Sequence, residues 1–185
     1  VGESPPPTAS DQTALDQTAS DQTAPRGFSY LVDGKLAGMA YPGQGEQADS
    51  ALSYLGDQGM TRLVSLTEEA PVPDKVKAAG IEQVHIPVKD FTAPSIEQLE
   101  GFIADTRSHL DGGGKVTVHC AGGKGRTGTF LSAWLISEDE MSAEDAIAAV
   151  RKLRPGSVET ASQEQILADL ATKLRAAPAA GAVTP

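Results

Sequence analysis

Cysteine, basic charge and long apolar runs are all scarce in this sequence, and each shortage excludes a class of protein. A single cysteine, Cys120, stands among 185 residues, so no internal disulfide can hold the fold together. No apolar run approaches the roughly 20 residues that a membrane-spanning helix needs. Lys and Arg number 15 against 25 Asp and Glu, and the net charge of −10 argues against a nucleic-acid partner held by a basic surface.

The length suits one domain with tails. Residues 1–26 contain three consecutive prolines and then a repeated Asp-Gln-Thr-Ala motif, in which Leu15 is the one large apolar residue. Such a segment cannot offset the entropy lost on ordering, so we predict a disordered amino-terminal tail that acts as a spacer. Partner binding or a role in export is the alternative. The folded domain is expected at 27–175, and the Ala-, Pro- and Gly-rich residues 176–185 are expected to fray.

The apolar pattern within the folded domain predicts strands that alternate with helices. Asp33-Gly34, flanked by two apolar runs, is a strong signal for a β-hairpin. Further strands are expected at 62–66, 84–88 and 115–118, and helices at 48–55, 74–79, 96–110, 127–138, 142–153 and 160–175. This order indicates an α/β fold in which helices flank a central, mostly parallel sheet on both faces.

The stretch at 119–128, His-Cys-Ala-Gly-Gly-Lys-Gly-Arg-Thr-Gly, connects an expected strand to an expected helix. Its glycines allow backbone dihedrals in which several N–H groups turn into one concavity that binds anions. The helix beginning near Thr127 adds partial positive charge, and the planar guanidinium of Arg126 suits bidentate binding of a phosphate. Because these fields would stabilise a thiolate at Cys120, the stretch predicts phosphoryl transfer through a phosphocysteine.

The order Cys-x5-Arg-Thr, preceded by His, resembles the signature of the protein tyrosine and dual-specificity phosphatases. Further matches at 28–30, 34–38, 63–68 and 153–160 resemble the small atypical dual-specificity phosphatases in particular. The resemblance covers roughly residues 27–175 and implies a protein tyrosine phosphatase-like fold with one catalytic domain. It implies hydrolysis of phosphotyrosine, and of phosphoserine and phosphothreonine where the cleft is shallow.

The resemblance also assigns roles within the loop. Cys120 would be the nucleophile. The phosphate would be bound by Arg126 together with Ala121, Gly122, Gly123, Lys124 and Gly125. The Thr127 hydroxyl would bond the cysteine sulfur and help it leave, unless the residue serves only as a helix N-terminus. His119 would orient the loop and favour the thiolate, although a satisfied core histidine explains it equally well. Since the guanidinium and the loop amides neutralise the phosphate oxygens, neither a metal nor another cofactor is expected.

Two further residues are candidates outside the loop. By resemblance, Asp90 would be the general acid that protonates the leaving oxygen and then accepts a proton from water. Its rivals are the carboxylates of Glu68, Glu69 and Asp74. Gln163 stands where the family often places a glutamine that positions water, but Thr160 and Gln163 also form a capping-box pattern that explains it without catalysis.

Two other functions remain open. Lys124 within the loop is shared with the tensin-like phosphoinositide phosphatases, but Ala121 stands where they carry a second lysine, so an inositol phosphate substrate is an alternative. A non-catalytic phosphate-binding module is the second. The expected partners are a phosphorylated protein or a small phosphate ester, with no nucleic acid and no membrane span, and the chain is expected to be a monomer. A thiolate favours a reducing, cytoplasmic location, with export after removal of a signal peptide as the alternative.

Overall fold

The computed structural model describes residues 23–176, which form a five-stranded sheet with helices on both faces. The strands are β1 (Ser29–Val32), β2 (Leu36–Met39), β3 (Arg62–Ser65), β4 (Glu82–His85) and β5 (Val116–His119). They lie in the order β1-β2-β5-β3-β4. Only β1 runs antiparallel, paired to β2, and the remaining pairings are parallel. The strand that leads into the predicted loop therefore lies at the centre of the sheet.

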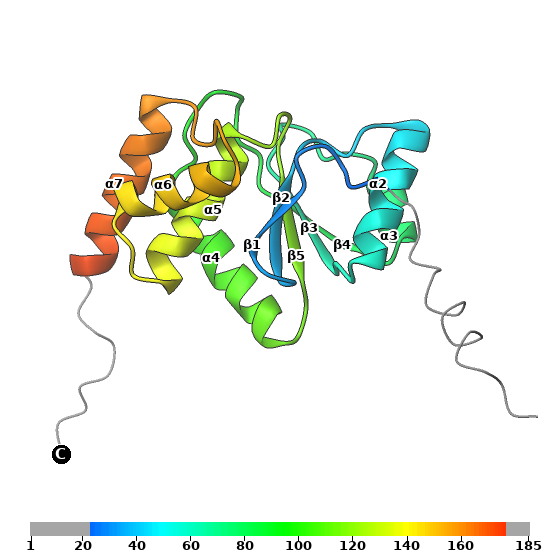
Figure 1. The fold of residues 1–185 in the computed structure, drawn as a ribbon, viewed down its shortest axis with the longest axis horizontal. Helices are drawn as coiled ribbons and strands as arrows, with labels where there is room; N and C mark the ends of the chain where they lie inside the picture. The colour runs from blue at the N-terminus through cyan, green and yellow to red at the C-terminus, as the bar shows by residue number, and fades with distance from the viewer. Residues whose placement is uncertain (1–22, 177–185) are drawn as a thin grey trace, which may run out of the picture.

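Helices cover the two faces unequally (Figure 1). The helices are α2 (Gly45–Asp57), α3 (Pro73–Ala78), α4 (Ile96–Asp111), α5 (Gly125–Glu138), α6 (Ala143–Leu153) and α7 (Ala161–Ala176). In Figure 1, α2 and α3 lie on one side of the sheet, and α4, α5, α6 and α7 lie on the other. This architecture confirms the predicted α/β fold with a central, mostly parallel sheet.

Local signals in the sequence account for several element boundaries. The predicted hairpin joins β1 to β2, and Gly34 occupies the turn with φ +64°, a value that favours glycine. At the start of α4, the Ser95 hydroxyl accepts from the Gln98 N–H while the Gln98 side chain accepts from the Ser95 N–H, which is a complete capping box. Ser142 caps α6 by accepting from the Asp145 N–H.

Helix α5 is enclosed on every side, because its first twelve residues, 125–136, are all buried. It packs against α4, α6 and α7 as well as against the sheet. Phe130 on α5 meets Phe102 on α4 edge to face, with ring centroids 5.1 Å apart. A helix held this firmly fixes the position of its first turn, which is where the predicted phosphate-binding loop ends.

Some boundaries differ from those predicted. The strand expected at 84–88 is found at Glu82–His85, although the N–H groups of Ile86 and Val88 still donate to the Ser65 and Leu66 carbonyls. Helix α5 begins at Gly125, two residues earlier than expected. Ordered contacts begin before residue 27, since the Arg26 carbonyl accepts from the Ala40 N–H. The tails predicted at 1–26 and 176–185 fall mostly outside the described residues.

Candidate active site

The loop between β5 and α5 turns two of its carbonyl groups outward. The Ala121 carbonyl accepts from the Tyr41 N–H at 3.1 Å, and the Gly123 carbonyl accepts from an arginine side chain at 2.6 Å. In a trans peptide the N–H points opposite to the C=O of the same unit. The N–H groups of Gly122 and Lys124 are therefore directed to the inner side of the loop, as an anion-binding nest requires.

Cys120 lies at the start of this loop, directly after β5. Its side chain is only 2% exposed, and its sulfur accepts from the Gly123 N–H at 3.2 Å. Gly123 has φ +70°, and a Cβ there would lie 2.6 Å from the Ala40 nitrogen, so only glycine fits. Because α5 begins at Gly125, its N-terminal partial charge adds to the amide that faces the sulfur. These features favour an anion at the sulfur or beside it.

Arg126, in the first turn of α5, is anchored on one side and available on the other. It is 3% exposed, and Nη1 donates to the Val88 carbonyl at 2.9 Å and to the Leu66 carbonyl at 3.4 Å. Nη2 forms an ion pair with Oδ1 of Asp90 at 2.7 Å. Nε has no hydrogen-bond partner among residues 23–176. The edge formed by Nε and Nη2 has the fork geometry that binds a phosphate with two parallel hydrogen bonds.

Asp90 is the carboxylate that the structure brings to this arginine. Phe91, the next residue, has φ +57°, and its N–H donates to Oδ1 of Asp90 at 3.1 Å, so a tight local turn aims the carboxylate. Glu68, Glu69 and Asp74, its rivals, are exposed, and none forms an ion pair with Arg126 in the described part of the chain. The geometry therefore favours Asp90 over the other three.

His119 is fully buried at the end of β5. Nδ1 lies 3.3 Å from the Cys120 carbonyl and Nε2 lies 2.8 Å from the Ser65 hydroxyl. A carbonyl can only accept, so Nδ1 carries the proton and the neutral ring accepts from Ser65 at Nε2. Burial lowers the pKa of His119 to about 4, and the Arg126 charge acts in the same direction. His119 is therefore a neutral ring that holds the backbone at the cysteine.

This pKa predicts how stability depends on pH. Below pH 6.5 an unfolded histidine takes up a proton that buried His119 refuses until about pH 4. Stability should therefore fall as pH drops through that window, by about 2 kcal/mol between pH 7 and pH 5 from this residue. In a His119→Gln variant, urea unfolding should show a correspondingly smaller loss. His109→Gln, at a partly buried histidine outside the site, is the matched control, and equal losses in both variants and the wild type would contradict the assignment.

Thr127 and Gln163 do not meet the atoms that their predicted roles require. Thr127 is buried, and its hydroxyl has no partner within residues 23–176, so no bond to the Cys120 sulfur is formed. Gln163 is also fully buried. Its Nε2 donates to the Thr92 carbonyl at 3.1 Å, and its Oε1 accepts from the Glu159 N–H at 2.8 Å. Both ends of the amide are thus occupied, and Gln163 links α7 to the segment that carries Asp90.

The structure adds three residues to the site that the sequence patterns did not single out for these contacts. Glu159 accepts from the Gly125 N–H at 2.8 Å, so a carboxylate occupies the last amide of the loop. Ser65, at the end of β3, donates to His119 as described above. Arg154 is the arginine that binds the Gly123 carbonyl. All three residues lie within the matched stretches, Ser65 in 63–68 and both Arg154 and Glu159 in 153–160, but the match itself predicts none of these contacts.

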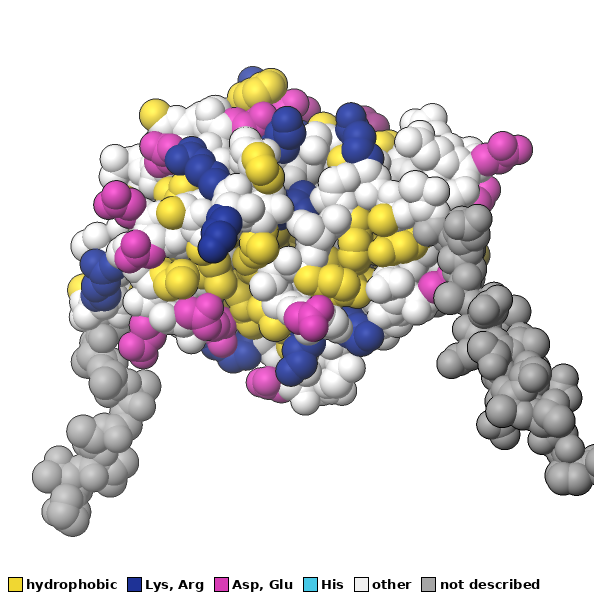
Figure 2. Space-filling view, in the orientation of Figure 1, with side chains coloured by type: hydrophobic (Ala, Val, Ile, Leu, Met, Phe, Trp, Pro, Cys, Tyr) yellow, Lys and Arg dark blue, Asp and Glu magenta, His cyan; other side chains and the backbone are white. Residues whose placement is uncertain are grey.

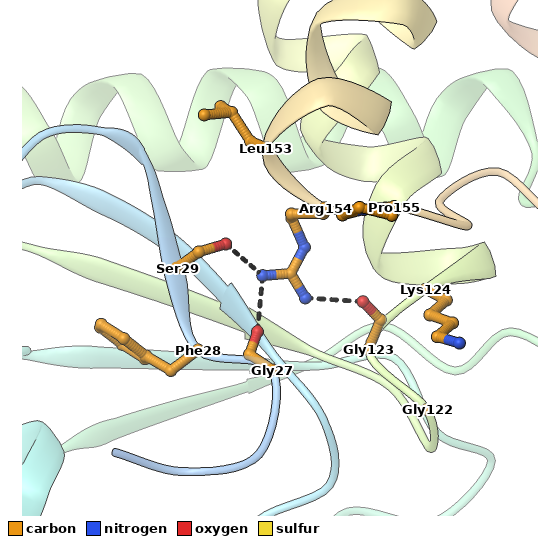
Figure 3. Close-up of a pocket in the computed structure, with 9 residues that line it drawn as sticks. All are labelled: Gly27, Phe28, Ser29, Gly122, Gly123, Lys124, Leu153, Arg154 and Pro155. Carbon is orange, nitrogen blue, oxygen red and sulfur yellow. Dashed lines mark hydrogen bonds between the residues drawn. The ribbon is translucent and has the colours of Figure 1, made fainter.

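A small hollow of about 210 Å³ lies beside the loop (Figure 3). Phe28, Lys124, Leu153 and Arg154 contribute side chains to its lining, whereas Cys120 does not. The Lys124 side chain lies against Gly156. Within residues 23–176, no group of three or more His, Cys, Asp and Glu side chains is placed to hold a metal ion. None of the described helices has the length and hydropathy needed to cross a membrane.

Comparison with known proteins gives a match over most of the chain. A family model described as a Swiss Army Knife protein with a DSP-PTPase phosphatase domain (PTP-SAK) matches residues 25–167. The tyrosine-protein phosphatase CDC14 of Candida albicans is 30% identical over 116 residues, which are 63% of this chain and 21% of that protein. The chain spans about a fifth of the length of the first curated relatives that it matches.

Solved structures also resemble this chain. A crystal structure of Tk-PTP in the active form is 33% identical with a TM-score of 0.72, and the match covers 80% of this chain and 97% of that one. PTPMT1 in complex with PI(5)P has a TM-score of 0.70 at 23% identity, covering 80% of this chain and 96% of that one. At that identity the second likeness concerns the fold alone.

Proposed function

The chain belongs to the family of DSP-PTPase phosphatase domains, and from that membership we propose that it hydrolyses phosphate monoesters of proteins through a phosphocysteine intermediate. The observation that carries the proposal is the meeting of three groups at one loop. The Cys120 sulfur faces a loop amide, and Arg126 presents its free Nε beside the pair that it forms with Asp90. A thiolate, a phosphate clamp and a proton donor are the parts that this reaction needs.

In the first step the Cys120 thiolate attacks phosphorus in line with the ester oxygen. The S–P bond forms, the P–O bond breaks, and Asp90 gives its proton to the departing oxygen. Arg126 and the inward amides hold the equatorial oxygens throughout. In the second step water attacks phosphorus, Asp90 takes the proton, and the S–P bond breaks to release phosphate and the thiolate.

The assay that tests this function compares substrates side by side under reducing conditions. We expect turnover of p-nitrophenyl phosphate and of a phosphotyrosine peptide, with a phosphothreonine peptide accepted more slowly. Phosphatidylinositol phosphates should have a kcat/KM at least about tenfold lower than the phosphotyrosine peptide, because Ala121 replaces the second lysine and the Lys124 side chain lies against Gly156. If the inositide is the preferred substrate, the proposal of a protein substrate is wrong. If the chain binds phosphate but hydrolyses no ester, it is a binding module and not an enzyme.

Several finer statements belong to the same proposal. We propose that kinship is greatest with the atypical dual specificity phosphatase 23, on the matched stretches at 28–30, 34–38, 63–68 and 153–160. We propose that residues 27–175 are the catalytic domain, with tails at 1–26 and 176–185. Gel filtration of the full chain tests the expected monomer, and limited proteolysis tests the domain boundaries.

The proposed location and partners rest on charge and redox chemistry. A catalytic thiolate at Cys120 needs a reducing environment, which supports a cytoplasmic location over an exported one. The formal net charge is −10, and on the face shown in Figure 2 basic side chains are interspersed with acidic ones. Neither feature supports a nucleic-acid partner, so a phosphorylated protein is the proposed one.

A further inference from the structure

Arg154, directly after α6, joins three segments that are far apart in the sequence (Figure 3). Nη1 lies 2.7 Å from both the Gly27 carbonyl and the Ser29 hydroxyl, and 2.8 Å from the Gly38 carbonyl. Nη2 donates to the Gly123 carbonyl at 2.6 Å. One guanidinium therefore connects the entry to β1, the middle of β2 and the phosphate-binding loop.

The bond to Gly123 decides which way one peptide unit of the loop faces. With its carbonyl held by Arg154, the unit that joins Gly123 to Lys124 directs its N–H to the opposite side. That side is the interior of the loop, where the Gly123 N–H already donates to the Cys120 sulfur. Without the guanidinium, this carbonyl could exchange sides with the N–H, since glycine allows either orientation.

The charge of Arg154 is buried close behind the same loop. The side chain is 7% exposed, and no carboxylate forms an ion pair with it in the described chain. Burial lowers the pKa of Arg154, and the nearby Cys120 opposes that change. Because charge interactions are mutual, the guanidinium in turn stabilises a thiolate at Cys120. A buried cation without a carboxylate partner would otherwise be a costly way to hold three segments together.

We propose that Arg154 is a positioning residue for the phosphatase reaction, which fixes the Lys124 amide toward the substrate phosphate and supports the Cys120 thiolate from behind the loop. This inference rests on the proposed function, yet it concerns binding and thiol reactivity and can be measured without turnover. Since Cys120 is the one cysteine of the chain, alkylation by iodoacetamide reports on it alone.

The experiment compares the wild type with Arg154→Met, Arg154→Lys and the control Arg151→Met. Arg151, which lies in α6, also donates to backbone carbonyls, those of Ser157 and Val158, but it does not touch the catalytic loop. For each protein we would measure the melting temperature, the alkylation rate against pH and the affinity for inorganic phosphate. Arg154→Met should slow alkylation at neutral pH severalfold and weaken phosphate binding roughly tenfold.

The two other variants separate the effect of the guanidinium's geometry from the effect of its charge and from general loss of stability. Arg154→Lys keeps the charge but loses the fork, so its alkylation rate should stay near that of the wild type while phosphate binding weakens. Arg151→Met should change neither quantity. The inference is overturned if Arg154→Met matches Arg151→Met in both, or, where Arg154→Met does not fold, if Arg154→Lys binds phosphate like the wild type. A wild type that binds phosphate and alkylates readily, but hydrolyses no ester, would remove the proposed function and leave standing the role of Arg154 in phosphate binding and thiol reactivity.

Discussion

Replacing Cys120 with serine should abolish hydrolysis of p-nitrophenyl phosphate, with a loss in kcat on the order of 10⁴-fold or more. A serine hydroxyl remains protonated in the field that favours a thiolate, and no histidine base is available to activate it. His119 cannot take that role, because its ring is turned to Ser65 and to the Cys120 carbonyl. Release of p-nitrophenol, followed at a fixed temperature, measures the effect.

The same variant should still bind phosphate, and this separates lost chemistry from a lost site. The amides of the loop and the Arg126 guanidinium are unchanged by a substitution of sulfur by oxygen. Affinity for inorganic phosphate should therefore stay within a few-fold of the wild type, and the melting temperature should be similar. If Cys120→Ser retained hydrolysis, no phosphocysteine could lie on the pathway and the covalent mechanism would be wrong.

The elements that the sequence predicted well are those set by local chemistry. Asp33-Gly34 specifies its own turn, and Ser95 and Gln98 satisfy each other's backbone groups within one helical turn. The loop at 119–128 could also be predicted from the sequence, because its glycines, its cysteine and Arg126 stand at the fixed spacing that phosphate binding requires. In each case the residues that make the interaction lie within about ten positions of one another.

The contacts that the sequence could not predict are those that fold distant segments together. Arg154 meets Gly27 across 127 residues, and Gln163 meets Thr92 across 71 residues. No periodicity or spacing rule relates such pairs, since their proximity depends on how α6 and α7 pack against the sheet. The capping pattern of Thr160 and Gln163 was visible, but the use of the Gln163 amide to hold the segment after Asp90 was not.

Replacing Asp90 with asparagine should lower kcat for a phosphotyrosine peptide by about 10² to 10⁴-fold, since an amide cannot protonate the leaving phenoxide. The effect should be smaller for p-nitrophenyl phosphate, because p-nitrophenolate is stable enough to leave without a proton. KM should not rise: the carboxylate that pairs with Nη2 of Arg126 is removed, which frees a donor for the phosphate. A series of aryl phosphates with graded leaving-group pKa measures directly how kcat depends on the leaving group.

The segment around Asp90 should keep its place in that variant, because other contacts hold it. Val88 accepts from Arg126, and Thr92 accepts from Gln163, on either side of the substituted residue. A change in leaving-group dependence would thus report the lost proton and not a displaced loop. Glu69→Gln is the matched control, since Glu69 is an exposed carboxylate on the neighbouring loop. The assignment of the general acid fails if Asp90→Asn keeps the wild-type rate on phosphotyrosine, or if Glu69→Gln shows the steeper dependence instead.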